Sequence, residues 1–100
     1  MKLPEFQTSD DRVREFCLAN GIARLSLFGS VLRADFGAES DVDCLVEFQP
    51  GKSIGLFEFA GMQQLLTELM GRQVHLHTLT MLPPGARDRI AAGAKVQYAA

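Results

Sequence analysis

The stretch DVDCLVEF, residues 41–48, constrains the fold of this 100-residue chain more than any other. Apolar and polar side chains alternate along it, and successive side chains of a strand point to opposite faces. Val42, Cys44 and Val46 therefore share one face, whereas Asp41 and Asp43 share the other. The pattern predicts a strand that packs its apolar face against helices and begins its second face with two accessible carboxylates.

Hydrophobic periodicity and helix-breaking residues predict the remaining elements. The fold class that follows is α+β: a small mixed β-sheet with helices packed on one face. The segment 31–36 is left open as a short helical turn or a loop. The other predicted elements are a helix capped by Thr8 or Ser9 that stops at Asn20-Gly21, a strand 22–28, a helix 54–70 closed by Gly71, a strand 73–78, a weak helix 86–94 and a short strand 96–98.

Composition limits the classes of function. One hundred residues are enough for one domain, 1–100, with one modest core. A net charge of −2 lacks the basic surplus of a general nucleic-acid binder, so we expect no direct DNA binding. No apolar run approaches the roughly 20 residues that span a bilayer, and no signal-peptide core is found, so we expect a cytoplasmic protein without membrane contact. Cys17 and Cys44 lie among apolar residues, which favours two buried free thiols.

A Gly-Ser pair stands before the two aspartates, at the end of the predicted strand 22–28. Glycine at a turn lets backbone come close to a ligand, and backbone N–H groups with a hydroxyl can hold phosphate there. Two carboxylates on one strand face can bind Mg²⁺, which prefers oxygen ligands and substrate phosphates. Gly29, Ser30, Asp41 and Asp43 together therefore indicate phosphoryl or nucleotidyl transfer.

These residues resemble the signature of the nucleotidyltransferase superfamily that includes DNA polymerase beta. That signature is Gly-Ser, about ten residues, then Asp-x-Asp, and here Gly29-Ser30 is followed by VLRADFGAES and Asp41-Val42-Asp43. The chain is most similar to the minimal nucleotidyltransferases, or MNT proteins, so the resemblance implies a polymerase beta-like nucleotidyltransferase fold. It also implies that Asp41 and Asp43 bind Mg²⁺ and that Gly29 and Ser30 hold the β- and γ-phosphates. Arg33 stands where the family commonly has an arginine that can meet the triphosphate, although a solvated loop charge is an equal interpretation.

One position departs from the family pattern. The family usually carries a third carboxylate in a stretch like GR-x-VDLVT, which here reads GRQVHLHT, and His75 stands where the aspartate would be. By alternation, His75 and His77 share a face. His75 is either a general base, a ligand for a softer metal such as Zn²⁺ or Mn²⁺, or the mark of a site that binds nucleotide without catalysis. The two histidines are also compatible with plain surface residues.

The resemblance further implies a partner. MNT proteins are commonly antitoxins of a helical HEPN-domain toxin and transfer AMP from ATP onto a tyrosine of that toxin, so the resemblance implies that the chain binds ATP or another nucleoside triphosphate. The alternatives are a non-catalytic antitoxin that neutralises the toxin by contact, and a transferase for a small hydroxylated molecule such as an aminoglycoside. The apolar residues of the helix start IGLFEFAGM form a surface wider than a single apolar stripe. This indicates either that the helix is buried on two sides or that Leu56 or Phe57 contacts another protein. Homo- or hetero-oligomers are both possible.

Overall fold

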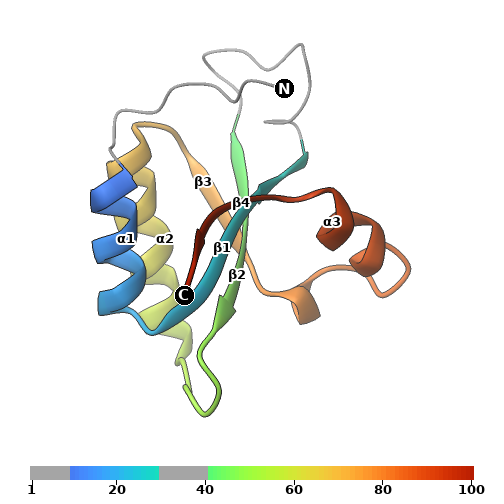
Figure 1. Cartoon of the computed structure of the whole chain (residues 1–100), viewed down its shortest axis with the longest axis horizontal. Helices are drawn as coiled ribbons and strands as arrows, with labels where there is room; N and C mark the ends of the chain where they lie inside the picture. Colours follow the sequence, from blue (N-terminus) through green and yellow to red (C-terminus); the bar gives the residue numbers. More distant parts are fainter. Residues whose placement is uncertain (1–9, 30–40) are drawn as a thin grey trace.

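The computed structural model describes residues 10–29 and 41–100. Its sheet has the strand order β3-β2-β1-β4, in which β2 and β3 are parallel and the other neighbours antiparallel (Figure 1). The predicted α+β class with a mixed sheet is therefore confirmed. The elements in chain order are α1 (Asp10–Ala19), β1 (Ile22–Phe28), β2 (Val42–Phe48), α2 (Leu56–Met70), β3 (Val74–His77), the 3-10 helix η2 (Leu79–Met81), α3 (Arg87–Gly93) and β4 (Lys95–Ala99).

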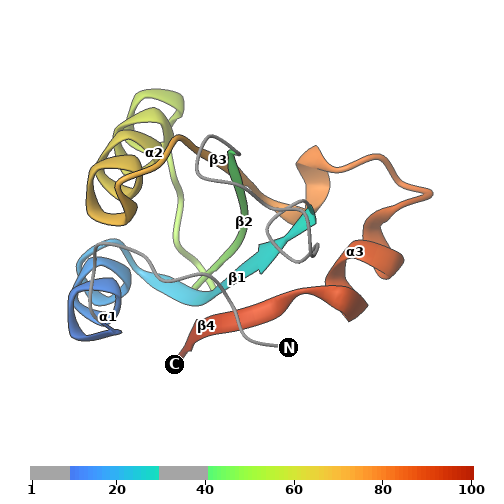
Figure 2. The ribbon, with the colours of Figure 1, turned by 90° about the horizontal axis from the view of Figure 1, so that it is seen from above.

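The main core lies between one face of the sheet and the helices α1 and α2, which lie side by side (Figure 2). Both cysteines belong to this core as free thiols, and burial raises the pKa of each to about 12. The thiols are therefore protonated at neutral pH, as expected of small apolar core side chains. The buried residues of the core are Val13, Phe16, Cys17, Ile22, Leu25, Leu27, Val42, Cys44, Val46, Met62, Leu66, Met70, Val74 and Leu76.

Within the part of the chain that the structure describes, a smaller second core lies on the opposite face of the sheet. Phe28 and Leu45 are buried there together with Leu82, and Ile90 and Ala94 from the α3 region pack against them. The prediction that helices pack on one face holds for α1 and α2, whereas the short α3 lies on the other side of the sheet (Figure 1). The reason is local: two large apolar side chains on this face need a cover that removes them from water. The carboxylates at the start of β2 lie beside this small second core.

The bounds of α2 differ from those that the hydrophobic pattern predicts. The helix begins at Leu56 and not at Ile54, because Gly55 takes an extended conformation as the N-cap, with φ −77° and ψ 164°. Ile54 contributes to the core from outside the helix. Gly71 ends the helix in the left-handed conformation, with φ 71°, and its N–H donates to the carbonyl of Thr67. The predicted C-cap is thus confirmed, while the predicted start extends two residues too far.

Side chains of α2 hold the outer edge of β3. The backbone N–H of Leu76 donates to Oε1 of Gln63 at 2.8 Å, and the N–H of Val74 donates to Oγ1 of Thr67 at 3.0 Å. These two donors belong to an edge strand, where unpaired backbone groups otherwise invite pairing with another chain. The helix therefore both satisfies the edge and fixes the position of β3 against it.

We expect Gln63→Ala to lower the free energy of unfolding by about 1–3 kcal/mol, because the N–H of the buried Leu76 loses its acceptor. The matched control is Gln64→Ala on the same helix, since that amide only reaches the exposed Glu68 at 3.4 Å, and its effect should stay within about 0.5 kcal/mol. Urea denaturation followed by circular dichroism measures both. Equal, small effects would show that α2 does not hold β3 through this side chain.

Candidate functional site

Asp41 and Asp43 lie at the start of β2, on the sheet face opposite α1 and α2. Asp41 directly precedes the strand and its side chain is 54% exposed; Asp43 is the second strand residue and its side chain is 31% exposed. Their neighbours Val42 and Cys44 are completely buried in the main core. The alternation seen in the sequence therefore places both carboxylates on one accessible face, as predicted.

Each carboxylate faces a histidine of β3. The parallel pairing sets Asp43 opposite His75, and Val74 and Leu76 turn into the core, so His75 and His77 emerge on the carboxylate face. Nε2 of His75 lies 2.8 Å from Oδ2 of Asp41, and Nε2 of His77 lies 3.4 Å from Oδ1 of Asp43. The chain thus brings together two aspartates and two histidines that are about 30 residues apart in sequence.

Gly29 is pressed against Asp43 from the end of β1. It takes the left-handed conformation, with φ +74°, and a Cβ atom placed on it would lie 2.9 Å from Oδ2 of Asp43. The left-handed conformation favours glycine at this position, and any Cβ would force the carboxylate of Asp43 to move. Ser30 and Arg33, the other predicted phosphate-binding residues, lie outside the described residues, as does the segment 31–36.

We expect Gly29→Ala to disturb the site through Asp43. Backbone strain should cost about 1–2 kcal/mol of stability, and the new methyl group should displace the carboxylate and weaken binding of Mg²⁺ with ATP by roughly tenfold or more. Gly51→Ala is the matched control, because Gly51 has φ +83° but nothing within 4 Å of a Cβ. Isothermal titration calorimetry on both variants checks this; equal affinities would separate Gly29 from the site.

Two accessible carboxylates form a donor set that fits Mg²⁺. Among residues 10–29 and 41–100, no three His, Cys, Asp or Glu side chains are grouped so that they could hold an ion by themselves. Mg²⁺ is commonly bound through one or two carboxylates, with water and substrate phosphates completing the octahedron. Asp41 and Asp43 supply that number of carboxylates on an accessible surface.

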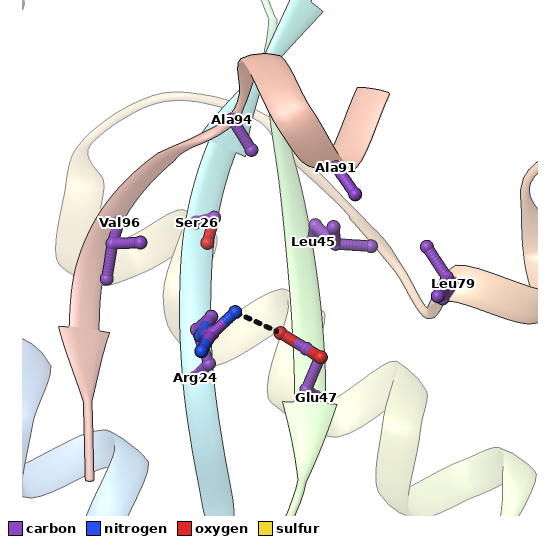
Figure 3. Close-up of a pocket in the computed structure, with 8 residues that line it drawn as sticks. All are labelled: Arg24, Ser26, Leu45, Glu47, Leu79, Ala91, Ala94 and Val96. Carbon is purple, nitrogen blue, oxygen red and sulfur yellow. Dashed lines mark ion pairs between the residues drawn. The ribbon is translucent and has the colours of Figure 1, made fainter. Parts of the chain in front are cut away.

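A small cavity continues the carboxylate face further along β2 (Figure 3). Leu45 and Glu47, which follow Asp43 on this face, line it together with small side chains of the α3 region, Ala91 and Ala94. Its volume of about 80 Å³ is far below the roughly 300–1,000 Å³ of pockets that enclose a drug-sized ligand. A nucleotide is therefore too large to bind inside this cavity.

Glu47 does not join the aspartates. It forms an ion pair with Arg24 of β1 at 3.5 Å (Figure 3). Glu47 lies four positions beyond Asp43 on the strand, which is about 13 Å at ~3.3 Å per residue. Glu47, which follows the aspartates on the same strand face, thus cannot replace the family's third carboxylate, as the strand spacing predicts.

The start of α2 exposes large apolar side chains at the other end of β2. Leu56 is 81% exposed and Phe57 92% exposed, and an open apolar groove of about 580 Å³ lies between Leu56, Phe59 and Met81. Of the two interpretations of this helix start, burial on two sides is thereby excluded. Exposed apolar surface of this kind is typical of a protein–protein contact.

His77 belongs to this site, although neither the Gly-Ser and Asp-x-Asp motif nor the family's third carboxylate position assigns it a role. Its position in the family pattern is not that of a carboxylate, so the motif gives no signal. The alternation of GRQVHLHT does place it on the face of His75, but its proximity to Asp43 follows from the pairing of β2 with β3, which connects residues 34 positions apart.

Comparison with known proteins agrees with this fold and motif. The chain belongs to the nucleotidyltransferase family: the family's model, described as a nucleotidyltransferase domain, matches residues 10–96. It is 38% identical over 73 residues to a candidate protein adenylyltransferase of Methanocaldococcus jannaschii, covering 73% of this chain and 76% of that protein. It is 34% identical over 65 residues to the protein adenylyltransferase MntA of Thermococcus cleftensis, covering 65% of this chain and 64% of that protein.

Solved structures share the same fold. A candidate minimal nucleotidyltransferase superposes with a TM-score of 0.68 at 30% identity, over 85% of each chain. A chain of a toxin–antitoxin complex with AMP-PNP reaches a TM-score of 0.72 at 16% identity, over 92% of this chain and 74% of that one. A chain of the complex between tri-AMPylated Shewanella oneidensis HEPN toxin and MNT antitoxin reaches 0.64 at 16% identity, over 91% and 70%. At 16% identity the likeness concerns the fold.

Proposed function

We propose that this protein transfers AMP from ATP to a side-chain hydroxyl of a HEPN-domain toxin and is the antitoxin of that pair. The observation that carries the proposal is the accessible pair Asp41 and Asp43, with Gly29 packed against Asp43, in a chain of the nucleotidyltransferase family. The relatives named protein adenylyltransferases and the complex that contains an AMPylated HEPN toxin support the same activity. Among the described residues, no helix is long and apolar enough to cross a membrane.

The residues divide the work of the reaction. Asp41 and Asp43 would hold Mg²⁺, which when bound neutralises phosphate charge. The turn at Gly29, with Ser30 and Arg33, would hold the β- and γ-phosphates. The acceptor hydroxyl oxygen forms a bond to the α-phosphorus of ATP while the bond from that phosphorus to the β-phosphate bridging oxygen breaks, so pyrophosphate leaves and the hydroxyl proton passes to a base.

His75 is the proposed base. Its Nε2 is 2.8 Å from Oδ2 of Asp41, and in the tautomer that donates this hydrogen bond the lone pair lies on Nδ1. The carboxylate thus orients the imidazole, as the third group does when it aligns a catalytic base. The side chain is 44% exposed, so an acceptor hydroxyl can approach it. In this proposal His75 performs the proton transfer that the family's third carboxylate would perform.

We expect Asp41→Asn and Asp43→Asn each to reduce AMP transfer to the toxin by at least about 100-fold, because each removes a charged ligand for Mg²⁺. Glu47→Gln is the matched control: it removes a charge from the same strand face but at the distant ion pair with Arg24, so transfer should be unchanged. The assay is incubation with labelled ATP, Mg²⁺ and the purified toxin. A wild type that binds and neutralises the toxin without labelling it would support the non-catalytic antitoxin instead.

We expect His75→Ala to slow transfer by about 10²–10⁴-fold, the usual contribution of a general base. His75→Asp should keep transfer within about tenfold of the wild type, because a carboxylate on the same face can also accept the proton. Single-turnover rates with saturating ATP measure this step. Transfer by His75→Ala at the wild-type rate would remove His75 from the reaction, and activity found only in His75→Asp would show that histidine disables the site.

A further inference from the structure

We infer that His77 is a positioning residue: it holds one oxygen of the Asp43 carboxylate so that the other is directed toward the metal and the phosphates. The inference rests on the proposed function in that it takes a metal-bound nucleotide as the ligand of Asp43. It assigns a role to a position outside the Gly-Ser and Asp-x-Asp motif. Three contacts among Asp43, His77, Phe28 and Gly29 carry it.

The two oxygens of Asp43 have different neighbours. Oδ1 lies 3.4 Å from Nε2 of His77 on the side of β3, slightly longer than the usual 2.7–3.2 Å of an N–H···O hydrogen bond. Oδ2 lies toward the opposite neighbour, β1, where a Cβ on Gly29 would approach it to 2.9 Å. The carboxylate is therefore held between β3 and the turn after β1. Its Oδ2 is the oxygen beside the turn that is proposed to hold phosphate.

The imidazole of His77 is itself held in place. Its ring meets the ring of Phe28 in an edge-to-face contact, with centroids 5.3 Å apart and an interplanar angle of 65°. Phe28 is buried in the second core with Leu45 and Leu82. Edge-to-face packing of this kind stabilises one ring orientation. Phe28 thus fixes the plane of the imidazole, and the imidazole in turn directs a nitrogen at Oδ1.

Burial separates the two histidines by role. The side chains of His77 and Asp43 are 28% and 31% exposed, whereas those of His75 and Asp41 are 44% and 54% exposed. The inner pair is therefore the more restrained one, and the outer pair is the more open to an acceptor. A restrained donor behind a metal ligand is the arrangement that orients such ligands, and losing it typically costs 10–100-fold in metal affinity or activity.

The test separates the donor from the ring. His77→Phe keeps an aromatic ring next to Phe28 but cannot donate a hydrogen bond, and His77→Gln supplies an amide N–H without the ring. Mn²⁺ is the probe, titrated with and without ATP and followed by the electron paramagnetic resonance signal of the free ion. We expect Mn²⁺ to bind His77→Phe about 10–100-fold more weakly than the wild type, and His77→Gln within a few-fold of it.

Three results would overturn the inference: wild-type affinity in His77→Phe, tighter binding in His77→Phe, or equal losses in both variants. Should His77→Phe fail to fold by circular dichroism, His77→Met provides a donor-free side chain in its place. Because the readout is metal binding, a wild type that does not label the toxin defeats the proposed function while leaving this comparison intact. A wild type that binds no Mn²⁺ even with ATP defeats both.

Discussion

The parallel pairing of β2 with β3 is the constraint on which the site depends. It sets Asp43 opposite His75, and with it the whole arrangement of two carboxylates and two imidazoles. A shift of one residue would turn the histidines into the main core and bring Val74 and Leu76 to the surface. The buried side chains of β3 and the hydrogen bonds from Gln63 and Thr67 of α2 both oppose that shift. Packing energy on one face thus positions polar groups on the other.

The two faces of the sheet serve different purposes. One is covered by α1 and α2 and contains most of the buried apolar residues. On the other face, among residues 10–29 and 41–100, Leu82 and the α3 region cover Phe28 and Leu45, and the carboxylates at the start of β2 are partly exposed. This cover has a functional consequence, because Phe28 belongs both to the second core and to the ring contact with His77. The small core therefore supports the site directly.

Local patterns predicted most of the fold. Alternation identified the faces of β2 and β3, and helical periodicity with Gly71 identified α2 and its end. The hydrophobic pattern places the start of α2 two residues too early. It includes Ile54, an apolar residue that packs against the core from outside the helix. The side of the sheet on which α3 lies could not be predicted, since it depends on how Phe28 and Leu45 become covered after the sheet forms.

The candidate site was predictable to the extent that a motif marks it. Asp41, Asp43 and Gly29 lie together, as the spacing indicates, and His75 lies within hydrogen-bond distance of Asp41. Ser30 and Arg33 lie outside the described residues, so their roles stay predictions. The pairing of His77 with Asp43 required a strand register that no local pattern specifies.

The central claim is that the carboxylates at the start of β2 form the metal and nucleotide site. The most direct measurement is a crystal structure of the protein with Mn²⁺ and AMP-PNP, with anomalous diffraction used to locate the metal. The account predicts an anomalous peak bound to the carboxylates of Asp41 and Asp43, with the triphosphate against the turn at Gly29 and His77 still beside Oδ1 of Asp43. A metal and nucleotide bound elsewhere on the molecule, with Asp41 and Asp43 still beside His75 and His77, would contradict it.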